Sequence, residues 1–352
     1  SATASNDAFG YVSLADNTST PLISGDEHFI QPCGIAVDGI HGYIYVSDLY
    51  NTTGSDIQGK GVTRYNLDGT GATKVVLPDI SASYFYYGIA LNADCTKLYY
   101  LQSGPTNDYV KVLDLATNTS AVLVSGDNTN AAVFSQPFGI AVDSANHYLY
   151  VADLYVSTGG TQRGRGIIRF NLDGTGATTV VAPDTTAAYQ YSGIALSADN
   201  TRLYYLQISP SNDYLKCLNL ADGTSSVLAS GDGTTNAVFM HPYGVALDPT
   251  DGDIYVADAH LQTGRGILRF NSDGSNVQTI KAGVAGTGYQ GIAVPVMAST
   301  EPTVIVEPQV GTLTYGGDAQ SATFSIKSTN FTNALTKDNY SIDWFSDAAG
   351  TM

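Results

Sequence analysis

The stretch QPCGIAVDGIHGYIYVSDLY, which spans Gln31–Tyr50, returns twice in the chain. QPFGIAVDSANHYLYVADLY occupies Gln136–Tyr155 and HPYGVALDPTDGDIYVADAH occupies His241–His260, so each copy begins 105 residues after the one before. Self-similarity at a fixed spacing is typical of repeat architectures, in which one structural unit is used several times. The structure formed by this unit therefore decides the fold.

Each 105-residue unit consists of two related halves. The second half begins YYGIALNAD at Tyr86 and YSGIALSAD at Tyr191, and it opens, like the first half, on glycine followed by small aliphatic residues. Six such starts follow one another at intervals of about 50 residues, which is the length of one propeller blade. Their glycines are Gly34, Gly88, Gly139, Gly193, Gly244 and Gly291.

Each half contains four short runs rich in valine, isoleucine and tyrosine, bounded by glycine, aspartate and asparagine, and this pattern is typical of β-strands. The sequence NLDGTG at Asn66–Gly71 has the composition of a hairpin turn. No helical periodicity stands out, so the sequence predicts an all-β fold, a six-bladed β-propeller built from three double-blade repeats. In the first blade the expected strands are Gly34–Asp38, Tyr43–Asp48, Gly61–Asn66 and Ala72–Leu77.

The two ends of the repeat region complement each other. The opening segment Asn6–Asp26 matches the outer half of a blade, while the sixth start, Gly288–Val296, has no outer half after it. We therefore expect the N-terminal strands to complete the sixth blade and close the ring, which removes the exposed edges that a linear array would leave. The propeller is predicted to occupy residues 1–297.

After a linker at residues 298–302 the sequence changes character. Residues 303–352, chiefly through QVGTLTYG and ATFSIKS, resemble the start of the bacterial immunoglobulin-like repeats found in tandem on surface proteins. The resemblance implies an incomplete immunoglobulin-like domain and further repeats of this kind in the parent chain. Whether residues 303–307 also serve as a strand of the sixth blade stays open.

The motifs GIAVD, YIYVSD and GVTRYNLDGTG resemble two related propeller families, the NHL type and the YWTD type of lipoprotein-receptor ectodomains. The resemblance covers Phe9 to about Val296, with YVSD and YVAD standing where the second family has YWTD. It implies a six-bladed propeller that serves as a binding platform, since enzymes are a minority in these families. Fold alone is a weak argument for function.

Composition excludes some classes of partner. The chain has 32 acidic and 15 basic residues, a net charge of −17, which is opposite to the basic surface that nucleic-acid binding requires. No apolar run reaches the roughly 18 residues of a membrane helix.

Cys33, Cys95 and Cys217 occupy non-equivalent repeat positions and form no CxxC pair, and Cys33 is expected to be a small apolar filler. The polar start SATASNDAFG and the abundance of small polar residues and tyrosine favour a secreted or cell-surface protein.

One face of the predicted propeller collects tyrosines and amides, because the connections entering the inner strands share it with the loops after the second strands. Tyrosine offers a flat apolar ring with a polar end, and nearby amides orient a ligand, as in many sugar and peptide sites. The alternative is that the tyrosines pack between blades. The candidate ligand-binding residues are Tyr84, Tyr86, Tyr189, Tyr191, Tyr289, Tyr50, Tyr155, Gln102, Gln207, His241 and His260.

Other repeated polar residues favour structural roles. We expect ion pairs that brace the odd blades between strand-terminal aspartates and two repeated sets of cations, one in the third strands and one between two glycines just before them. His241, His260 and Asp258 are a weak candidate for a metal site because no third histidine or further ligand accompanies them. The aspartates are Asp48, Asp153 and Asp258, the cations in the third strands are Arg64, Arg169 and Arg269, and those between two glycines are Lys60, Arg165 and Arg265.

No catalytic motif is evident in the sequence: there is no GxSxG, no phosphate-binding loop and no EF-hand. No cofactor is expected, and calcium is supported by no motif. The sequence thus predicts non-catalytic recognition or adhesion, with a glycan or protein ligand on the tyrosine-rich face. Two alternatives remain, a metal-dependent propeller hydrolase or lyase and a structural spacer of a surface stalk.

Overall fold

The computed structural model forms two compact units, residues 1–296 and 297–352. Within them it describes residues 8–24, 31–48, 61–79, 84–104, 107–126, 133–154, 166–184, 189–209, 212–231, 238–258, 266–283, 289–294, 303–306 and 326–329. None of these residues belongs to a helix that is long and apolar enough to cross a membrane.

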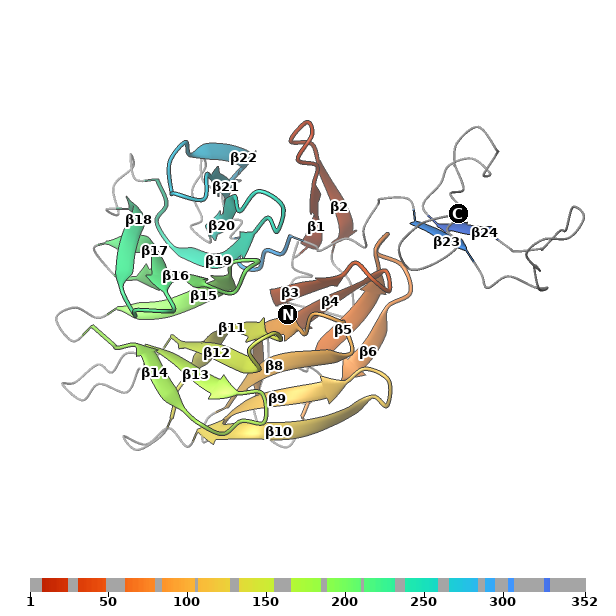
Figure 1. Cartoon of the computed structure of the whole chain (residues 1–352), viewed down its shortest axis with the longest axis horizontal. Helices are drawn as coiled ribbons and strands as arrows, with labels where there is room; N and C mark the ends of the chain where they lie inside the picture. Colours follow the sequence, from red (N-terminus) through yellow and green to blue (C-terminus); the bar gives the residue numbers. More distant parts are fainter. Residues whose placement is uncertain are drawn as a thin grey trace, which may run out of the picture. The chain divides into compact units, whose positions relative to one another are not determined.

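Five four-stranded antiparallel sheets make up most of the first unit, and each is a meander whose neighbours in sequence are neighbours in the sheet (Figure 1). They are the first five blades, and the expected strands of blade 1 agree with β3–β6 to within two residues at every end. The blades are β3 (Pro32–Asp38), β4 (Tyr43–Asp48), β5 (Val62–Asn66) and β6 (Thr73–Val76); β7 (Phe85–Leu91), β8 (Lys97–Ser103), β9 (Asp108–Asp114) and β10 (Thr119–Gly126); β11 (Pro137–Asp143), β12 (Tyr148–Asp153), β13 (Ile167–Asn171) and β14 (Thr178–Val181); β15 (Gln190–Leu196), β16 (Arg202–Ile208), β17 (Asp213–Asn219) and β18 (Ser225–Gly231); and β19 (Pro242–Leu247), β20 (Ile254–Asp258), β21 (Gly266–Phe270) and β22 (Gln278–Ala282).

The six repeat glycines form a closed cycle of contacts at the centre. Each lies so close to the inner strand of the next blade that a Cβ atom would collide with a backbone carbonyl oxygen there. The last of the six returns the cycle to the first blade, so the ring has six inner segments. The glycines and the carbonyls they face are Gly34 and Tyr87, Gly88 and Phe138, Gly139 and Ser192, Gly193 and Tyr243, Gly244 and Gln290, and Gly291 and Cys33.

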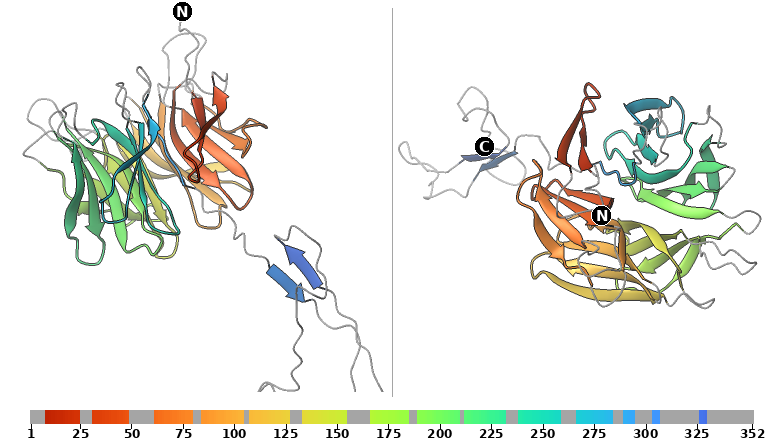
Figure 2. Two further views of the ribbon diagram at one scale, coloured as in Figure 1. Left: turned by 90° about the horizontal axis from the view of Figure 1, so that it is seen from above. Right: turned by 180° about the vertical axis from the view of Figure 1, so that it is seen from behind.

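The sixth blade is assembled from both ends of the unit. Residues 289–294 supply its inner segment, while the hairpin of β1 (Ala8–Val12) and β2 (Ser19–Ser24) lies between β22 and β3 (Figures 1 and 2). The ring of Phe9 packs 5.0 Å from that of Tyr65 in blade 1. On the other side, Lys281 Nζ of blade 5 donates to Ser19 Oγ at 2.6 Å. The all-β six-bladed propeller closed by N-terminal strands is thus confirmed.

The second unit contains one described strand pair, β23 (Thr303–Val306) with β24 (Ile326–Thr329). Residues 303–306 therefore pair with a strand of their own unit. The remainder of the predicted immunoglobulin-like segment lies outside the described residues.

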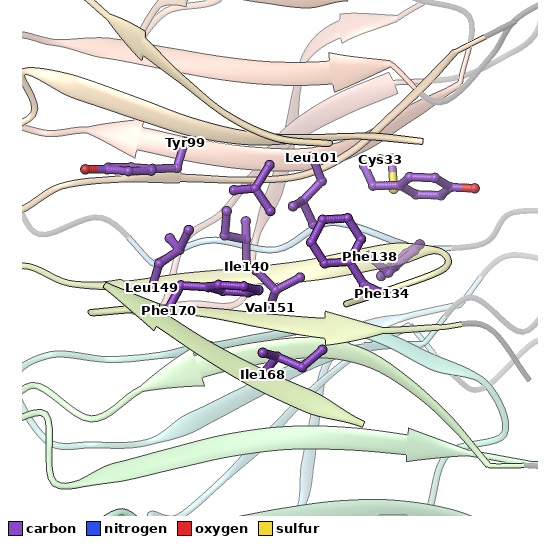
Figure 3. Packing of buried hydrophobic residues seen from close by; sticks show 12 residues of the cluster. Cys33, Tyr99, Leu101, Phe134, Phe138, Ile140, Leu149, Val151, Ile168 and Phe170 are labelled. Carbon is purple, nitrogen blue, oxygen red and sulfur yellow. The ribbon is translucent and has the colours of Figure 1, made fainter. Parts of the chain in front are cut away.

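Apolar side chains fill the spaces between blades, as Figure 3 shows between blades 2 and 3. Leu101, Val151 and Phe170 are at most 1% exposed there. Cys33 belongs to the same cluster, and burial raises the pKa of its thiol to about 12, so it is the apolar filler that its position predicts. The blades are therefore held together by interfaces of buried apolar side chains, to which loop residues such as Phe134 and Phe239 also belong.

Candidate functional site

The boundary between blades 1 and 2 carries a row of polar side chains on its loop side. Tyr86 of β7 lies opposite Gln102 of β8, which in turn lies opposite Tyr109 of β9. Residues directly opposite one another in an antiparallel sheet project from the same face. Because Tyr86 and Tyr109 pack with the hydrophobic residues of blade 1, this row faces that blade.

A second tyrosine pair lies beside this row. The rings of Tyr84 and Tyr109 are 6.0 Å apart and tilted by 55°. Lys111 Nζ lies 5.0 Å from the centroid of the Tyr109 ring, a cation–π geometry. Burial lowers the pKa of Lys111, while the carboxylate of Asp79 acts in the opposite direction. We call Asp79, Tyr84, Tyr86, Gln102, Tyr109 and Lys111 the first tyrosine cluster.

The same arrangement recurs between blades 3 and 4. The rings of Tyr189 and Tyr214 are 6.0 Å apart and tilted by 55°, and Lys216 Nζ lies 5.1 Å from the Tyr214 centroid. The row of opposite residues is also repeated, with Gln207 between two tyrosines. We call Asp184, Tyr189, Tyr191, Gln207, Tyr214 and Lys216 the second tyrosine cluster.

The two glutamines present unsatisfied amides. Gln102 is 1% exposed, and neither its Oε1 nor its Nε2 has a hydrogen-bond partner. Gln207 Nε2 donates to Tyr191 Oη at 3.4 Å, whereas its Oε1 has no partner. A buried polar group without a partner costs about 1–3 kcal/mol, so sites of this kind attract water or a ligand hydroxyl.

Two predicted site residues, Tyr86 and Tyr191, serve packing. Both side chains are 2% exposed. Tyr86 Oη accepts a hydrogen bond from the backbone nitrogen of Asp79 at 2.9 Å, and its ring stacks on Tyr100. Tyr191 Oη accepts from the backbone nitrogen of Asp184 at 3.1 Å in the same way. These tyrosines tie the loop before the inner strand to the blade, which is the packing alternative raised by the sequence.

Two other predicted residues, Tyr289 and His241, do not belong to either cluster. Tyr289 is half-buried, and its backbone nitrogen donates to the carbonyl of Asp258 at 3.2 Å. His241 is exposed, and its backbone nitrogen donates to the Asp258 carboxylate at 3.1 Å. Among the residues that the structure describes, no three histidine, cysteine or acidic side chains converge on a metal position. Tyr50, Tyr155 and His260 lie outside the described residues.

The strand-terminal aspartates accept hydrogen bonds from backbone nitrogens, and the third-strand arginines have other partners, so the expected pairing between these two sets is wrong. Lys60, Arg165 and Arg265 lie outside the described residues. Asp153 accepts hydrogen bonds from the backbone nitrogens of Ser135 at 2.9 Å and Gln136 at 2.8 Å. Asp48 and Asp258 accept from the equivalent loops. Each carboxylate thereby fixes the loop that enters the inner strand of its own blade.

The arginines lie too far along the strands to reach these aspartates. Arg64 is opposite Tyr45, three residues before the strand end, and its guanidinium stacks 4.3 Å from the Tyr43 ring centroid. Arg169 stacks on Tyr148 at the same distance. In blade 5 the partner of Arg269 is Asp253, at 2.5 Å from Nε. Residue types alone did not specify these partners.

Sequence reasoning missed two buried aspartates. Asp108 is fully buried, accepts a hydrogen bond from Ser103 Oγ at 2.5 Å, and has its pKa raised to about 7, chiefly by burial. Asp213 is 2% exposed, and burial likewise raises its pKa to about 7. The signal was present in the repeated NDYVKV and NDYLKC segments, which also carry the missed tyrosine and lysine of each cluster.

A groove of about 460 Å³ opens on the opposite, hairpin-turn side, between blades 4 and 5. Two of its lining residues are smaller than their counterparts in other blades. Ser272 stands where blade 3 has Leu172, which packs on the core between blades 2 and 3. Cys217, also in the lining, stands where blade 2 has Val112. The lining residues are Arg202, Cys217, Asn219, Thr224, Ser225, Ser226, Leu228, Ser272 and Asp273.

Filling this groove is expected to stabilise the propeller. The double substitution Ser272→Leu with Cys217→Val restores the side chains of the earlier repeat, and cavity filling of this kind raises the free energy of unfolding by about 0.5–2 kcal/mol. Urea unfolding measures the change. The reciprocal Leu172→Ser variant should lose about 1–3 kcal/mol. A lower free energy of unfolding in the double variant would show that the groove cannot accommodate the larger side chains found at the equivalent positions.

Comparisons with known proteins identify a fold. No protein-family model matches the chain, and no curated protein is detectably similar to it. A chain of a nidogen/laminin complex is similar in structure with a TM-score of 0.58 at 16% identity, over 79% of this chain and 89% of that one. The common property is the β-propeller.

Two bacterial structures show the same likeness. TolB from Acinetobacter baumannii has a TM-score of 0.55 at 11% identity, over 80% of this chain and 62% of that one. The gluconolactonase XC5397 from Xanthomonas campestris has a TM-score of 0.51 at 18% identity, over 74% and 78%. At sequence identities this low, the similarity indicates a shared fold only. An activity has to be argued from this chain's own residues.

Proposed function

We propose that the propeller is a non-catalytic recognition module that binds a neutral, hydroxyl-rich ligand, a glycan, through its tyrosine clusters. The observation that carries the proposal is the unsatisfied Gln102 amide in a row with two tyrosines on the loop side of the ring. An amide both donates and accepts, as sugar hydroxyls do, so each can satisfy the other.

The neighbouring groups suit such a ligand. Tyrosine rings provide flat apolar area for the C–H faces of a sugar, and their hydroxyls add polar contacts. Lys111 and Asp79 in the first cluster offer one donor and one acceptor of opposite charge, which favours a ligand without net charge. The net charge of −17 also disfavours anionic polymers.

The chemistry of the clusters favours binding over catalysis. Burial and a hydrogen bond with Tyr109 raise the pKa of Tyr84 to about 12, so the phenol stays protonated at neutral pH. The carboxyls whose pKa lies near neutrality, Asp108 and Asp213, each come one residue before the cluster tyrosine of their strand and therefore project from the opposite face of the blade, away from the cluster. A metal-dependent hydrolase or lyase is the competing proposal, and metal bound to the purified protein would favour it.

The setting we propose is an extracellular, secreted or surface-attached bacterial protein with a role in adhesion. Support comes from the composition and from the resemblance of the C-terminal segment to bacterial immunoglobulin-like repeats. We likewise propose that the repeat motifs place the propeller with the NHL and YWTD types. A spacer without any ligand is the alternative in this setting.

A glycan-array screen of the full 352-residue chain, with calcium and with chelator, tests the function. We expect binding to neutral glycans that Tyr84→Ala with Tyr189→Ala reduces at least tenfold. Tyr11→Ala is the matched control, because this tyrosine is 53% exposed on β1 and outside both clusters. No binding to any glycan would contradict the proposal and favour a protein ligand or a spacer, while binding unchanged by the cluster substitutions would place the site elsewhere.

A further inference from the structure

The ring contains a third position equivalent to the two clusters, and there the cluster residues are absent. In blade 2, Tyr109 of β9 lies opposite Ser125 of β10. In the sixth blade the corresponding pair is Ala8 of β1 opposite Ser24 of β2. Counting along these strands, Gly10 takes the place of Lys111. The sixth blade thus lacks both the aromatic ring and the ammonium group.

The carboxylate of the clusters is lost at the third position too. The glycine that begins the third strand packs on the carbonyl of Val76 in blade 1 and on that of Lys281 in blade 5, so these two residues are equivalent. Three residues after Val76 comes Asp79; three residues after Lys281 the sequence has Val284.

The tyrosine with a packing role is nevertheless kept at all three positions. Tyr86, Tyr191 and Tyr289 each precede the repeat glycine of their blade by two residues. Two residues before Tyr289 the sequence has Thr287, where the two clusters have Tyr84 and Tyr189. The ring therefore closes on the sixth blade without the tyrosine pair, the lysine and the aspartate. Since a blade can form without these four residues, they are not required for folding. Their matching geometry in blades 2 and 4 therefore indicates a functional role.

We infer that the propeller has two equivalent ligand sites, at the blade 1–2 and blade 3–4 boundaries, and is bivalent toward a polymer of neutral, hydroxylated units. This inference rests on the proposed function and adds the number of sites and the repetitive nature of the ligand. Both clusters lie on the loop side of one compact unit, so a single polysaccharide strand or surface can engage them together. Once one site is occupied, the second binds at a high effective concentration, and avidity exceeds the affinity of either site by about 10²–10⁴-fold.

The experiment counts sites on the full chain. Native mass spectrometry and calorimetry with neutral hexasaccharides of glucose, mannose and N-acetylglucosamine give the stoichiometry, and retention on the matching polysaccharides gives the avidity. We expect two hexasaccharides per chain, one for Tyr109→Ala, one for Tyr214→Ala and none for the double variant. Each single variant should keep the hexasaccharide affinity of its remaining site and lose about 100-fold on the polymer.

Controls separate binding from folding. Tyr11→Ala should keep two sites, and Gln102→Met, which keeps the side-chain volume, should lose one site while remaining folded. A stoichiometry of one for the native chain, or loss of both sites in a single variant whose thermal unfolding is unchanged, overturns bivalency and leaves the proposed function standing. No binding to any hexasaccharide or polysaccharide overturns both.

Discussion

Replacing Asp108 and Asp213 by asparagine is expected to remove most of the stability loss that the native propeller undergoes as the pH rises through about 7. Both carboxyls are buried, and burial raises the pKa of each to about 7 from an ordinary value of 3.8. Between these values the folded state holds protons that the unfolded chain has released. The stability they contribute is therefore complete below about pH 4 and is lost as the pH passes the folded pKa.

The size of this effect follows from the same shift. One unit of pKa difference corresponds to about 1.4 kcal/mol, so each aspartate is expected to account for a few kcal/mol between pH 5 and 8.5. Asparagine keeps the Oδ1 acceptor that Ser103 uses and carries no charge at any pH. The free energy of unfolding in urea, measured across this range, should be nearly flat for the double variant.

Asp68→Asn is the control for this experiment. Asp68 is exposed in a hairpin turn, and hydrogen bonds from Thr70 lower its pKa. Its replacement should leave the slope between pH 5 and 8.5 unchanged and act only at acid pH. If the free energy of unfolding of the Asp108 and Asp213 double variant still fell with pH as in the native chain, groups other than these two aspartates would be responsible for the pH dependence.

Gly139→Ala is expected to lower the free energy of unfolding by about 3 kcal/mol or more, or to prevent folding, because there is no space for a methyl group at this position. The added carbon would collide with the carbonyl oxygen of Ser192 and approach Ile194 N to 3.2 Å, both on the inner strand of the next blade. Backbone cannot rotate away as a side chain can, so the two blades would have to separate at the centre of the ring.

Gly223→Ala provides the comparison for the central glycine. Gly223 has a φ of +73° and no neighbouring atom within 4 Å, so alanine there meets only the backbone preference, about 1–2 kcal/mol. Urea unfolding of both variants gives the difference. If both variants lost the same free energy of unfolding, the inner strands at the centre of the ring would be able to move apart and accommodate a methyl group.

The sequence predicted the blades well because their signals are local. The six glycines, the aspartate–glycine turns and the short strands each depend on neighbouring residues, and β3 begins only two residues earlier than expected, at Pro32. Ring closure was also predictable, since the N-terminal segment repeats the outer half of a blade. These features need no knowledge of packing between blades.

The site was predicted only in part, because it depends on which side chains meet across blades. Tyr84 and Gln102 were expected on the loop side and do lie in a cluster. Lys111 and Tyr109 belong to the third strand, and only the strand pairing brings them to Tyr84. Arg64 was assigned to a carboxylate, whereas register places it beside the Tyr43 ring.

Closure by the two ends of the unit also sets an order in time during synthesis. Ser19 leaves the ribosome 262 residues before its partner Lys281, a delay of roughly 13–50 s at ordinary translation rates. Throughout that interval the first hairpin can pack on blade 1, through Phe9, while its neighbour in blade 5 has not yet been made. Blades 1 to 5 can form while the chain grows, but the ring is completed only after translation has passed residue 294. The sixth blade is therefore the last part of the ring to be completed, although its outer hairpin is synthesised first.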